Sequence, residues 1–396
     1  MTKGVDERGP RLAARADAIE RSKIRYMFDR AAAIDRELVH LEIGEPDFDT
    51  PPHITEAAYQ AARDGATHYT SNAGIQPLRN AIAGRAQQLH EYDTDPDTEI
   101  VVTAGAMEAI HLAMLAVVNP GDEVVIPEPA WPNYRAQVQL AGGTPIPVCL
   151  DSASGFDLDP GRVIDAISSD TAAVLLNSPS NPTGRIYDSQ AIADVVDTAA
   201  EHDAYVIADE VYARIQFGTF QPAIRAVTDQ PEHVLVVDSV SKAYAMTGWR
   251  VGWLIGPQAV IDVATKFHES VTACAAAPAQ HAALAALEGD QAPVEHMRDA
   301  YHDRRDVLCS RIENISGISC RPPDGAIYVF VDVRELGSDS LAVAETLLEE
   351  HDLVTAPGSG FGEPGEGFLR LSIANSEANL HAGADALAAF ASEAQS

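Results

Sequence analysis

The chain has 396 residues, of which 46 % are apolar, and this length allows one large core or two smaller ones. It carries 59 acidic and 27 basic residues, which gives a formal net charge of -32. A surface this negative repels nucleic acids and anionic membranes, so neither is an expected partner. Apolar runs are short and interrupted by charged residues, glycine or proline, so we also expect no membrane span.

The acidic residues are spread along the whole chain, and lysine is rare. Acidic residues that are spread in this way do not form the continuous block that is typical of a disordered acidic tail. Salt screens the self-repulsion of such a chain, so the composition predicts a protein from a high-salt environment. The polar N-terminus lacks an apolar signal region, and the four cysteines have no paired or metal-binding spacing. We therefore expect a cytoplasmic protein with reduced thiols.

The order of expected elements indicates the fold class. A helix is expected at Leu12–Ala33, and a short strand at Leu41–Asp49 that runs into a turn. Short apolar strands then alternate with helices, which predicts an α/β fold with a mostly parallel sheet between helices. From about Pro293 the pattern changes to that of a smaller α+β unit, so a ligand cleft is expected between the two. The six strands are expected at Ile100–Thr103, Glu123–Ile126, Ala172–Leu176, Ala204–Ala208, Val234–Val237 and Val251–Ile255.

Lys242 is the strongest candidate for a catalytic residue. It directly follows an apolar strand, and burying a lysine is costly unless its pKa falls or it forms a covalent bond. A Schiff base meets both conditions. Ser239, Ser241 and Arg250 offer two hydroxyl groups and a guanidinium group that suit a phosphate. A lone lysine is more often an ordinary residue at a helix start, but these neighbours favour a cofactor site.

Asp209 and Tyr212 lie at the end of another apolar strand. A carboxylate there would face the cleft, and beside a pyridine nitrogen it would keep that nitrogen protonated. Tyr212 could reach the phenolic oxygen of the same ring. The alternative interpretation of Asp209 is a helix N-cap.

A turn of small residues leads from the strand at residues 100–103 into a helix. Backbone N–H groups at Gly105, Ala106 and Met107 could bind an anion there, although such turns often only start a helix. Trp131 follows the next strand and could stack on a cofactor ring, or else belong to the core or an interface.

Two further residues could bind polar groups of a ligand. Asn181 lies in a rigid turn, where its amide could bind a ring oxygen or a substrate carboxylate. Arg370 alternates with leucines on a strand, and an arginine near a cleft suits a carboxylate. The alternative for Arg370 is a position on the surface.

These motifs together resemble the class I/II aminotransferases of the fold-type-I pyridoxal-phosphate (PLP) enzymes, and most closely the prokaryotic aspartate-aminotransferase-like branch. The similarity extends from about residue 15 to residue 390. It implies a large PLP-binding domain at residues 51–292 and a smaller α+β domain built from residues 1–50 and 293–396. The motifs are GEPDFDTP at Gly44–Pro51, the Tyr69–Gly74 segment, NPTG at Asn181–Gly184, DEVY at Asp209–Tyr212, SxSK at Ser239–Lys242, GxRxG at Gly248–Gly252 and LRLS at Leu369–Ser372.

The resemblance also implies a role for each site residue. Lys242 would bind the cofactor as a Schiff base and move the substrate proton. Arg370, Asn181 and the backbone of Gly44 would bind the substrate α-carboxylate. Tyr69 would reach the phosphate in a neighbouring subunit, which implies a homodimer. Asp209 would pair with the pyridinium nitrogen, Tyr212 and Asn181 would bind the ring oxygen, Trp131 would stack on the ring, and Gly105, Ala106, Met107, Ser239, Ser241 and Arg250 would hold the phosphate.

The implied reaction moves the amino group of an L-amino acid, aspartate or similar, to a 2-oxo acid such as 2-oxoglutarate in a ping-pong sequence. No residue identifies the substrate side chain, although Arg21, Arg25 or a residue of the other subunit could bind a second carboxylate. The alternatives are another PLP reaction on the same fold, such as a C–S lyase or a synthase, a ligand-sensing regulator and a nucleotide-binding protein. The last two are disfavoured because the chain lacks a basic DNA-binding region and a GxGxxG turn.

Overall fold

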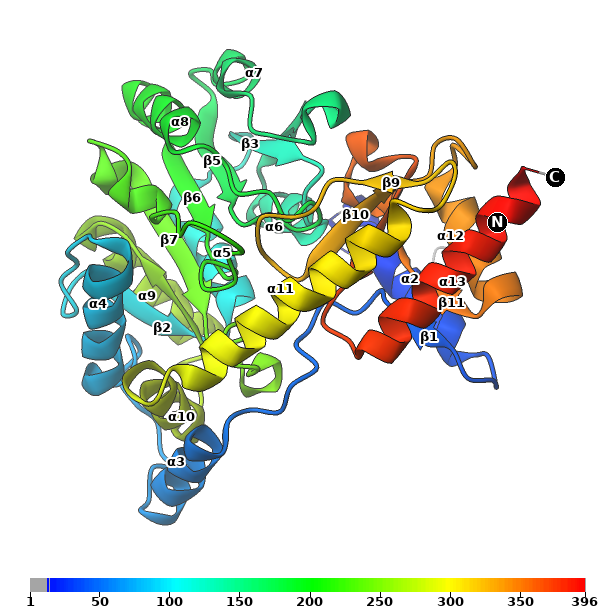
Figure 1. Cartoon of the computed structure of the whole chain (residues 1–396). Helices are drawn as coiled ribbons and strands as arrows, with labels where there is room; N and C mark the ends of the chain where they lie inside the picture. The colour runs from blue at the N-terminus through cyan, green and yellow to red at the C-terminus, as the bar shows by residue number, and fades with distance from the viewer. Residues whose placement is uncertain (1–12, 14, 396) are drawn as a thin grey trace, which may run out of the picture.

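A seven-stranded sheet forms the centre of the larger part of the molecule (Figure 1). The computed structural model describes residue 13 and residues 15–395 and gives the strand order β2-β8-β7-β6-β5-β3-β4. Six of the seven strands run in the same direction, and only β8 is reversed, antiparallel to both of its neighbours, so the prediction of a mostly parallel sheet is confirmed. The strands are β2 (Ile100–Thr103), β3 (Glu123–Glu128), β4 (Thr144–Cys149), β5 (Thr171–Asn177), β6 (Tyr205–Asp209), β7 (Val234–Ser239) and β8 (Gly252–Ile255).

Both faces of this sheet are covered by helices because its strands are apolar on both sides. Val174 and Leu176 of β5 belong to the core shared with α4, α8 and α10. Ala173 and Leu175 of the same strand face the opposite core, shared with α5, α6 and α9. The helices of this part are α3 (Pro52–Arg63), α4 (Gln76–His90), α5 (Ala106–Val117), α6 (Asn133–Ala141), α7 (Pro160–Asp165), α8 (Ser189–Glu201), α9 (Gln258–Val271) and α10 (Ala277–Glu288).

The smaller part joins the two ends of the chain. β1 pairs in parallel with β11, and Met27 and Leu41 share a core with Leu380 and Leu387. This packing supports the predicted division at residues 50 and 292, which stays a prediction. α11 runs from the larger part to the smaller one (Figure 1). The elements are α1 (Arg15–Ala18), α2 (Lys23–Ala32), β1 (Val39–His40), α11 (Ala292–Ile312), β9 (Ser319–Cys320), β10 (Tyr328–Asp332), α12 (Ser340–His351), β11 (Leu353–Val354), β12 (Ala356–Pro357), β13 (Phe368–Ser372) and α13 (Glu377–Ala394).

Three sequence predictions of elements differ from the structure. The single helix expected at Leu12–Ala33 is two helices, α1 and α2, interrupted before Ser22, whose extended backbone precedes the second; residues 12 and 14 lie outside the described part. The strand expected at Leu41–Asp49 is irregular, since Gly44 and Pro46 disfavour a ladder. Strand β4 was not predicted because it contains two prolines at a sheet edge. Among the helices of residues 15–395, none is both long and apolar enough to cross a membrane.

Candidate active site

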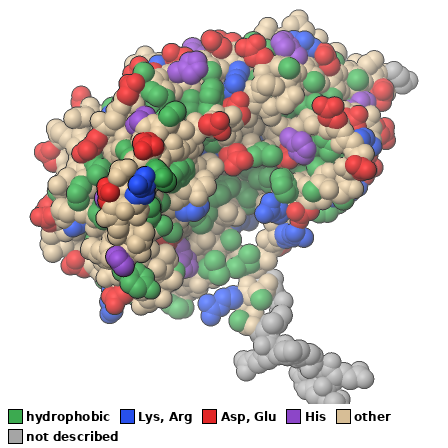
Figure 2. Space-filling model, turned by 90° about the horizontal axis from the view of Figure 1, so that it is seen from below, with side chains coloured by type: hydrophobic (Ala, Val, Ile, Leu, Met, Phe, Trp, Pro, Cys, Tyr) green, Lys and Arg blue, Asp and Glu red, His purple; other side chains and the backbone are tan. Residues whose placement is uncertain are grey.

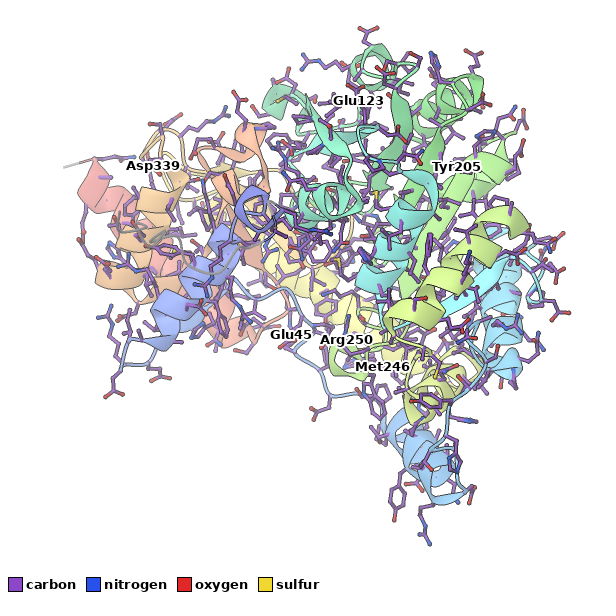
Figure 3. The ribbon with its side chains drawn as sticks, turned by 180° about the vertical axis from the view of Figure 1, so that it is seen from behind. Glu45, Glu123, Tyr205, Met246, Arg250 and Asp339 are labelled. Carbon is purple, nitrogen blue, oxygen red and sulfur yellow. The ribbon has the colours of Figure 1, made fainter. Side chains whose placement is uncertain are left out.

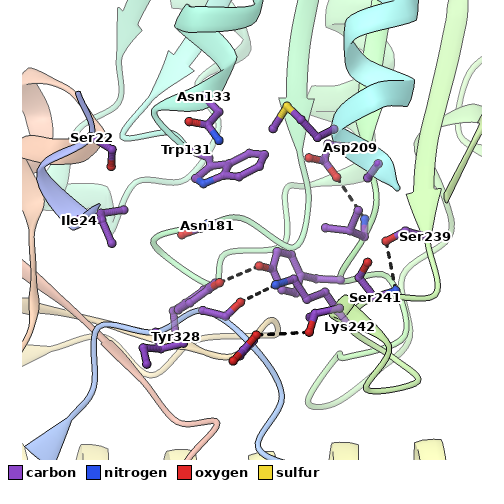
Figure 4. Close-up of a pocket in the computed structure, with 18 of the residues that line it drawn as sticks. Ser22, Ile24, Trp131, Asn133, Asn181, Asp209, Ser239, Ser241, Lys242 and Tyr328 are labelled. Atoms are coloured by element: carbon purple, nitrogen blue, oxygen red, sulfur yellow. Dashed lines mark hydrogen bonds between the residues drawn. The ribbon is translucent and has the colours of Figure 1, made fainter. Parts of the chain in front are cut away.

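A cavity of about 710 Å³ lies where the two parts of the molecule meet (Figure 4). The ends of β6 and β7, the start of α5, helix α2 and residues 42–45 all contribute to its walls. Figure 3 shows Glu45 and Arg250, both lining residues, near this junction. The cavity brings together these predicted site residues: Gly44, Ala106, Met107, Trp131, Asn181, Asp209, Tyr212, Ser239, Ser241, Lys242, Arg250 and Arg370.

Lys242 presents its amine to the cavity. Strand β7 ends at Ser239, and the following turn places Lys242 among the lining residues. Its Nζ donates a hydrogen bond to the carbonyl oxygen of Gly44 and lies 5.7 Å from the centroid of the Tyr212 ring. A half-buried lysine that has no carboxylate partner among the described residues is suited to attack a carbonyl carbon.

Asp209 is a buried carboxylate at the end of β6, with 2 % of its surface exposed. Tyr134 Oη donates to Asp209 Oδ2 at 2.6 Å, and the backbone N–H of Val211 donates to Oδ1 at 3.2 Å. Burial raises the pKa of Asp209 to about 6, although both hydrogen bonds and the charge of Lys242 oppose that rise. A carboxylate so placed can hold a proton on a cationic ring nitrogen.

The start of α5 forms a cradle for an anion. Gly105 has φ +86°, and a Cβ atom there would lie 2.3 Å from Arg250 Nη2, so glycine allows this close approach. Gly105 is the N-cap of α5 and has no side chain, so no N-cap side chain occupies the first N–H groups of this helix. The buried residues Ser239 and Ser241 line the same cavity as Arg250. This combination of hydroxyl groups, guanidinium and helix N-terminus matches a phosphate group.

Arg370 provides a second, separate cationic site. It is 2 % exposed, which excludes the interpretation as a surface arginine. Its Nη1 donates to Asn181 Oδ1 at 3.1 Å, and its Nη2 donates to the carbonyl oxygen of Glu42. Its Nε is buried and has no hydrogen-bond partner in the described structure. A guanidinium held in this way can accept a carboxylate.

Sequence reasoning missed several lining residues. Tyr134 was not predicted, although it holds Asp209. Tyr328 was also missed; its Oη lies 2.8 Å from Tyr212 Oη, and a Cβ atom on Gly44 would lie 2.4 Å from it. Its aromatic ring on an expected strand was a possible signal, but a tyrosine in that position is more often core. Ser22, Ile24 and Phe28 were missed as well, and they add a wall from α2 together with Arg25, which the sequence had suggested as a possible ligand of a second carboxylate.

Tyr69 is absent from the lining of this cavity. Its side chain is 89 % exposed, and its contact with a neighbouring subunit stays a prediction.

Comparisons with known proteins identify the family of this chain. The model of the family "Aminotransferase class I and II" matches residues 36–387. The chain is 37 % identical to the aspartate aminotransferase of Pyrococcus horikoshii, over 93 % of this chain and 94 % of the relative. It is 34 % identical to an aromatic-amino-acid aminotransferase of Thermococcus litoralis, over 94 % of this chain and 96 % of the relative.

A solved structure extends the likeness to three dimensions. The aspartate aminotransferase of Thermus thermophilus with maleate superposes with a TM-score of 0.92 at 36 % identity, covering 96 % of this chain and 100 % of that one. The chain therefore belongs to the aminotransferase class I and II family and is a PLP-dependent aminotransferase.

Proposed function

We propose that this enzyme moves the amino group of L-aspartate, or of a close analogue, to a 2-oxo acid such as 2-oxoglutarate. The observation that carries the proposal is the arrangement of Lys242, Asp209 and Arg370 around one cavity. These residues offer an amine for an aldehyde, a carboxylate for a ring nitrogen and a guanidinium for a carboxylate. The names of the aspartate aminotransferases among the relatives favour aspartate as donor.

The donor set fits PLP group by group. The phosphate would be held by the N–H groups of Gly105, Ala106 and Met107 and by Ser239, Ser241 and Arg250, because this cradle is cationic and too narrow for a side chain at residue 105. Asp209 would pair with the ring nitrogen, Tyr212 and Asn181 would bind the ring oxygen, Trp131 would cover the ring, and Lys242 would attach the aldehyde carbon.

Different residues of the chain would bind the substrate and transfer its proton. Arg370, aided by Asn181 and the backbone of Gly44, would bind the α-carboxylate and so orient the Cα–H bond. Lys242 would accept the Cα proton and return it to the cofactor carbon beside the ring. When bound, PLP supplies a protonated ring that accepts the electrons of the broken bond. A 2-oxo acid would then take up the amino group at the same residues in the reverse order.

An absorbance titration of the purified protein tests this proposal. With PLP present, we expect an aldehyde band that one amino acid converts to the amine form and that 2-oxoglutarate restores. Release of ammonia and pyruvate without any 2-oxo acid acceptor would instead indicate a lyase. A protein without a cofactor band after addition of PLP would contradict the site as a whole.

We further propose a homodimer with shared active sites. Tyr69 supports this, since a tyrosine that is 89 % exposed gains little from solvent and could reach an anion in a second copy. Exposed Tyr59 and Val271 add apolar surface that a partner would cover. Light scattering of the purified protein is expected to give twice the mass of one chain, and a monomeric mass with full activity would contradict the proposal.

High salt and a cytoplasmic location are the remaining parts of the proposal. Acidic side chains are dispersed over the face seen in Figure 2, and the net charge is -32. Because salt screens their mutual repulsion, the free energy of unfolding is expected to rise with salt concentration. Urea titrations at low and high potassium chloride would measure this, and equal stability in both would contradict it.

A further inference from the structure

Four cationic side chains line the active-site cavity, and three of them already have a proposed partner. Lys242 faces the aldehyde, Arg250 the phosphate and Arg370 the α-carboxylate. The fourth is Arg25, on helix α2. In Figure 4 its helix neighbours Ser22 and Ile24 lie across the cavity from Ser239 and Lys242. Arg25 therefore belongs to the wall formed by α2 and not to the strand ends that carry Ser239 and Lys242.

Arg25 has no ion pair or hydrogen bond within the described residues, which distinguishes it from the arginines around it. Arg21 pairs with Asp29, and Arg30 pairs with Glu345 on α12. The guanidinium carbon of Arg25 instead lies 4.9 Å from the ring centroid of Phe28. Within the described residues Arg25 shares this lack of an acidic partner with Arg250 and Arg370, the two other arginines that line the cavity.

The carboxylates of the cavity do not compensate Arg25. Asp209 accepts from Tyr134, Glu42 lies 2.9 Å from the ring nitrogen of His40, and Glu45 accepts from Thr247. The lining residues beside Arg25 on α2, Ile24 and Phe28, are apolar. A ligand that carries a negative charge toward α2 would therefore find a cation that is not already paired with a carboxylate of the described residues.

We propose that Arg25 determines specificity by binding the side-chain carboxylate of dicarboxylic substrates, while Arg370 binds their α-carboxylate. The inference rests on the proposed function and names its substrate class: four- and five-carbon amino and 2-oxo dicarboxylic acids. Donor and acceptor occupy the same cavity in turn, so one arginine serves both. The ring of Phe28 supports the guanidinium without neutralising its charge.

Binding of inert acids to the PLP-loaded enzyme tests this assignment without turnover. Succinate carries two carboxylates and propionate one, and calorimetry gives the Kd of each. In Arg25→Met, we expect the Kd of succinate to rise about tenfold and that of propionate to change less than twofold. Arg21→Met is the matched control, because Arg21 is four residues away, exposed and outside the cavity lining. It should leave both constants unchanged.

Kinetics separate this inference from the proposed function. Arg25→Met should raise KM for aspartate and 2-oxoglutarate but not for alanine and pyruvate. The KM values of Arg25→Lys for the two dicarboxylic substrates should lie between those of the wild type and of Arg25→Met. Unchanged succinate binding in Arg25→Met, or wild-type binding of propionate as tight as that of succinate, would overturn the role of Arg25 while transamination remains. Wild-type enzyme that transaminates no donor at all would overturn the proposed function itself.

Discussion

The two walls of the cavity are built in different ways. The wall at the ends of β6 and β7 is buried, and Asp209 and Ser239 have hydrogen-bond partners within the protein. The wall from α2 is a ten-residue helix whose Arg25 and Phe28 are exposed, with Phe28 at 37 %. Groups fixed by burial hold one geometry, whereas an exposed helix face can change its side chains at little cost to the core. From this difference we expect the chemistry to depend on the first wall and the choice of substrate on the second.

The largest effect is expected where the buried wall meets the cofactor. Lys242→Ala removes both the covalent attachment and the proton carrier, so turnover should fall by about 10⁴-fold. Spectra with PLP should lose the aldehyde band shared with the lysine, while the thermal midpoint of the cofactor-free protein changes little. Lys266→Ala, an exposed lysine outside the cavity, is the control and should keep full activity. Full activity in Lys242→Ala would exclude this lysine.

The second largest effect is expected at Arg370, the proposed ligand of the substrate α-carboxylate. Arg370→Ala should raise KM for every amino acid by about 10- to 100-fold, because all share the α-carboxylate and the charged hydrogen bonds are buried. Arg334→Ala, an exposed residue paired with Asp332, is the matched control. A rise in KM confined to one donor would contradict binding of the shared α-carboxylate and would assign Arg370 to recognition of the substrate side chain.

The carboxyl of Asp209 should make cofactor affinity depend on pH. Its folded pKa of about 6 is raised by burial above the usual value of 3.8, so the cofactor-free protein binds a proton as pH falls from 7 to 5. The protonated form cannot pair with a cationic ring nitrogen, so the Kd for PLP should rise up to about tenfold per pH unit below 6. Fluorescence titrations should show that Asp209→Asn lacks this component. The same pH dependence in Asp209→Asn would assign it to another group.

Tyr134 should produce the smallest of these effects. Its hydrogen bond lowers the pKa of Asp209, so Tyr134→Phe should shift the pH midpoint of PLP binding upward. The lost hydrogen bond is worth about 1 kcal/mol, which corresponds to an upward shift of about 0.7 pH units in that midpoint and to a Kd about fivefold weaker below it. A midpoint that stays in place would show that Tyr134 only packs beside the carboxylate.

Most of the buried wall could be predicted from the sequence, and most of the exposed wall could not. Strands such as β6 are continuous apolar runs, and Asp209 and Lys242 follow their ends directly. Tyr134 is 75 positions from Asp209, and no local pattern links the two. The position of Arg25 depends on how α2 packs against the distant C-terminal segment, which periodicity along α2 does not encode.

The joining of both chain ends in one core has a consequence for synthesis on the ribosome. Met27 and Leu41 emerge early, but their core partners Leu353 and Leu380 are made about three hundred residues later. At cellular elongation rates this interval is on the order of tens of seconds. The sheet of the larger part can be complete before that time, while the N-terminal segment waits with its apolar face uncovered. The newly made chain therefore has its greatest need of chaperone protection at its beginning.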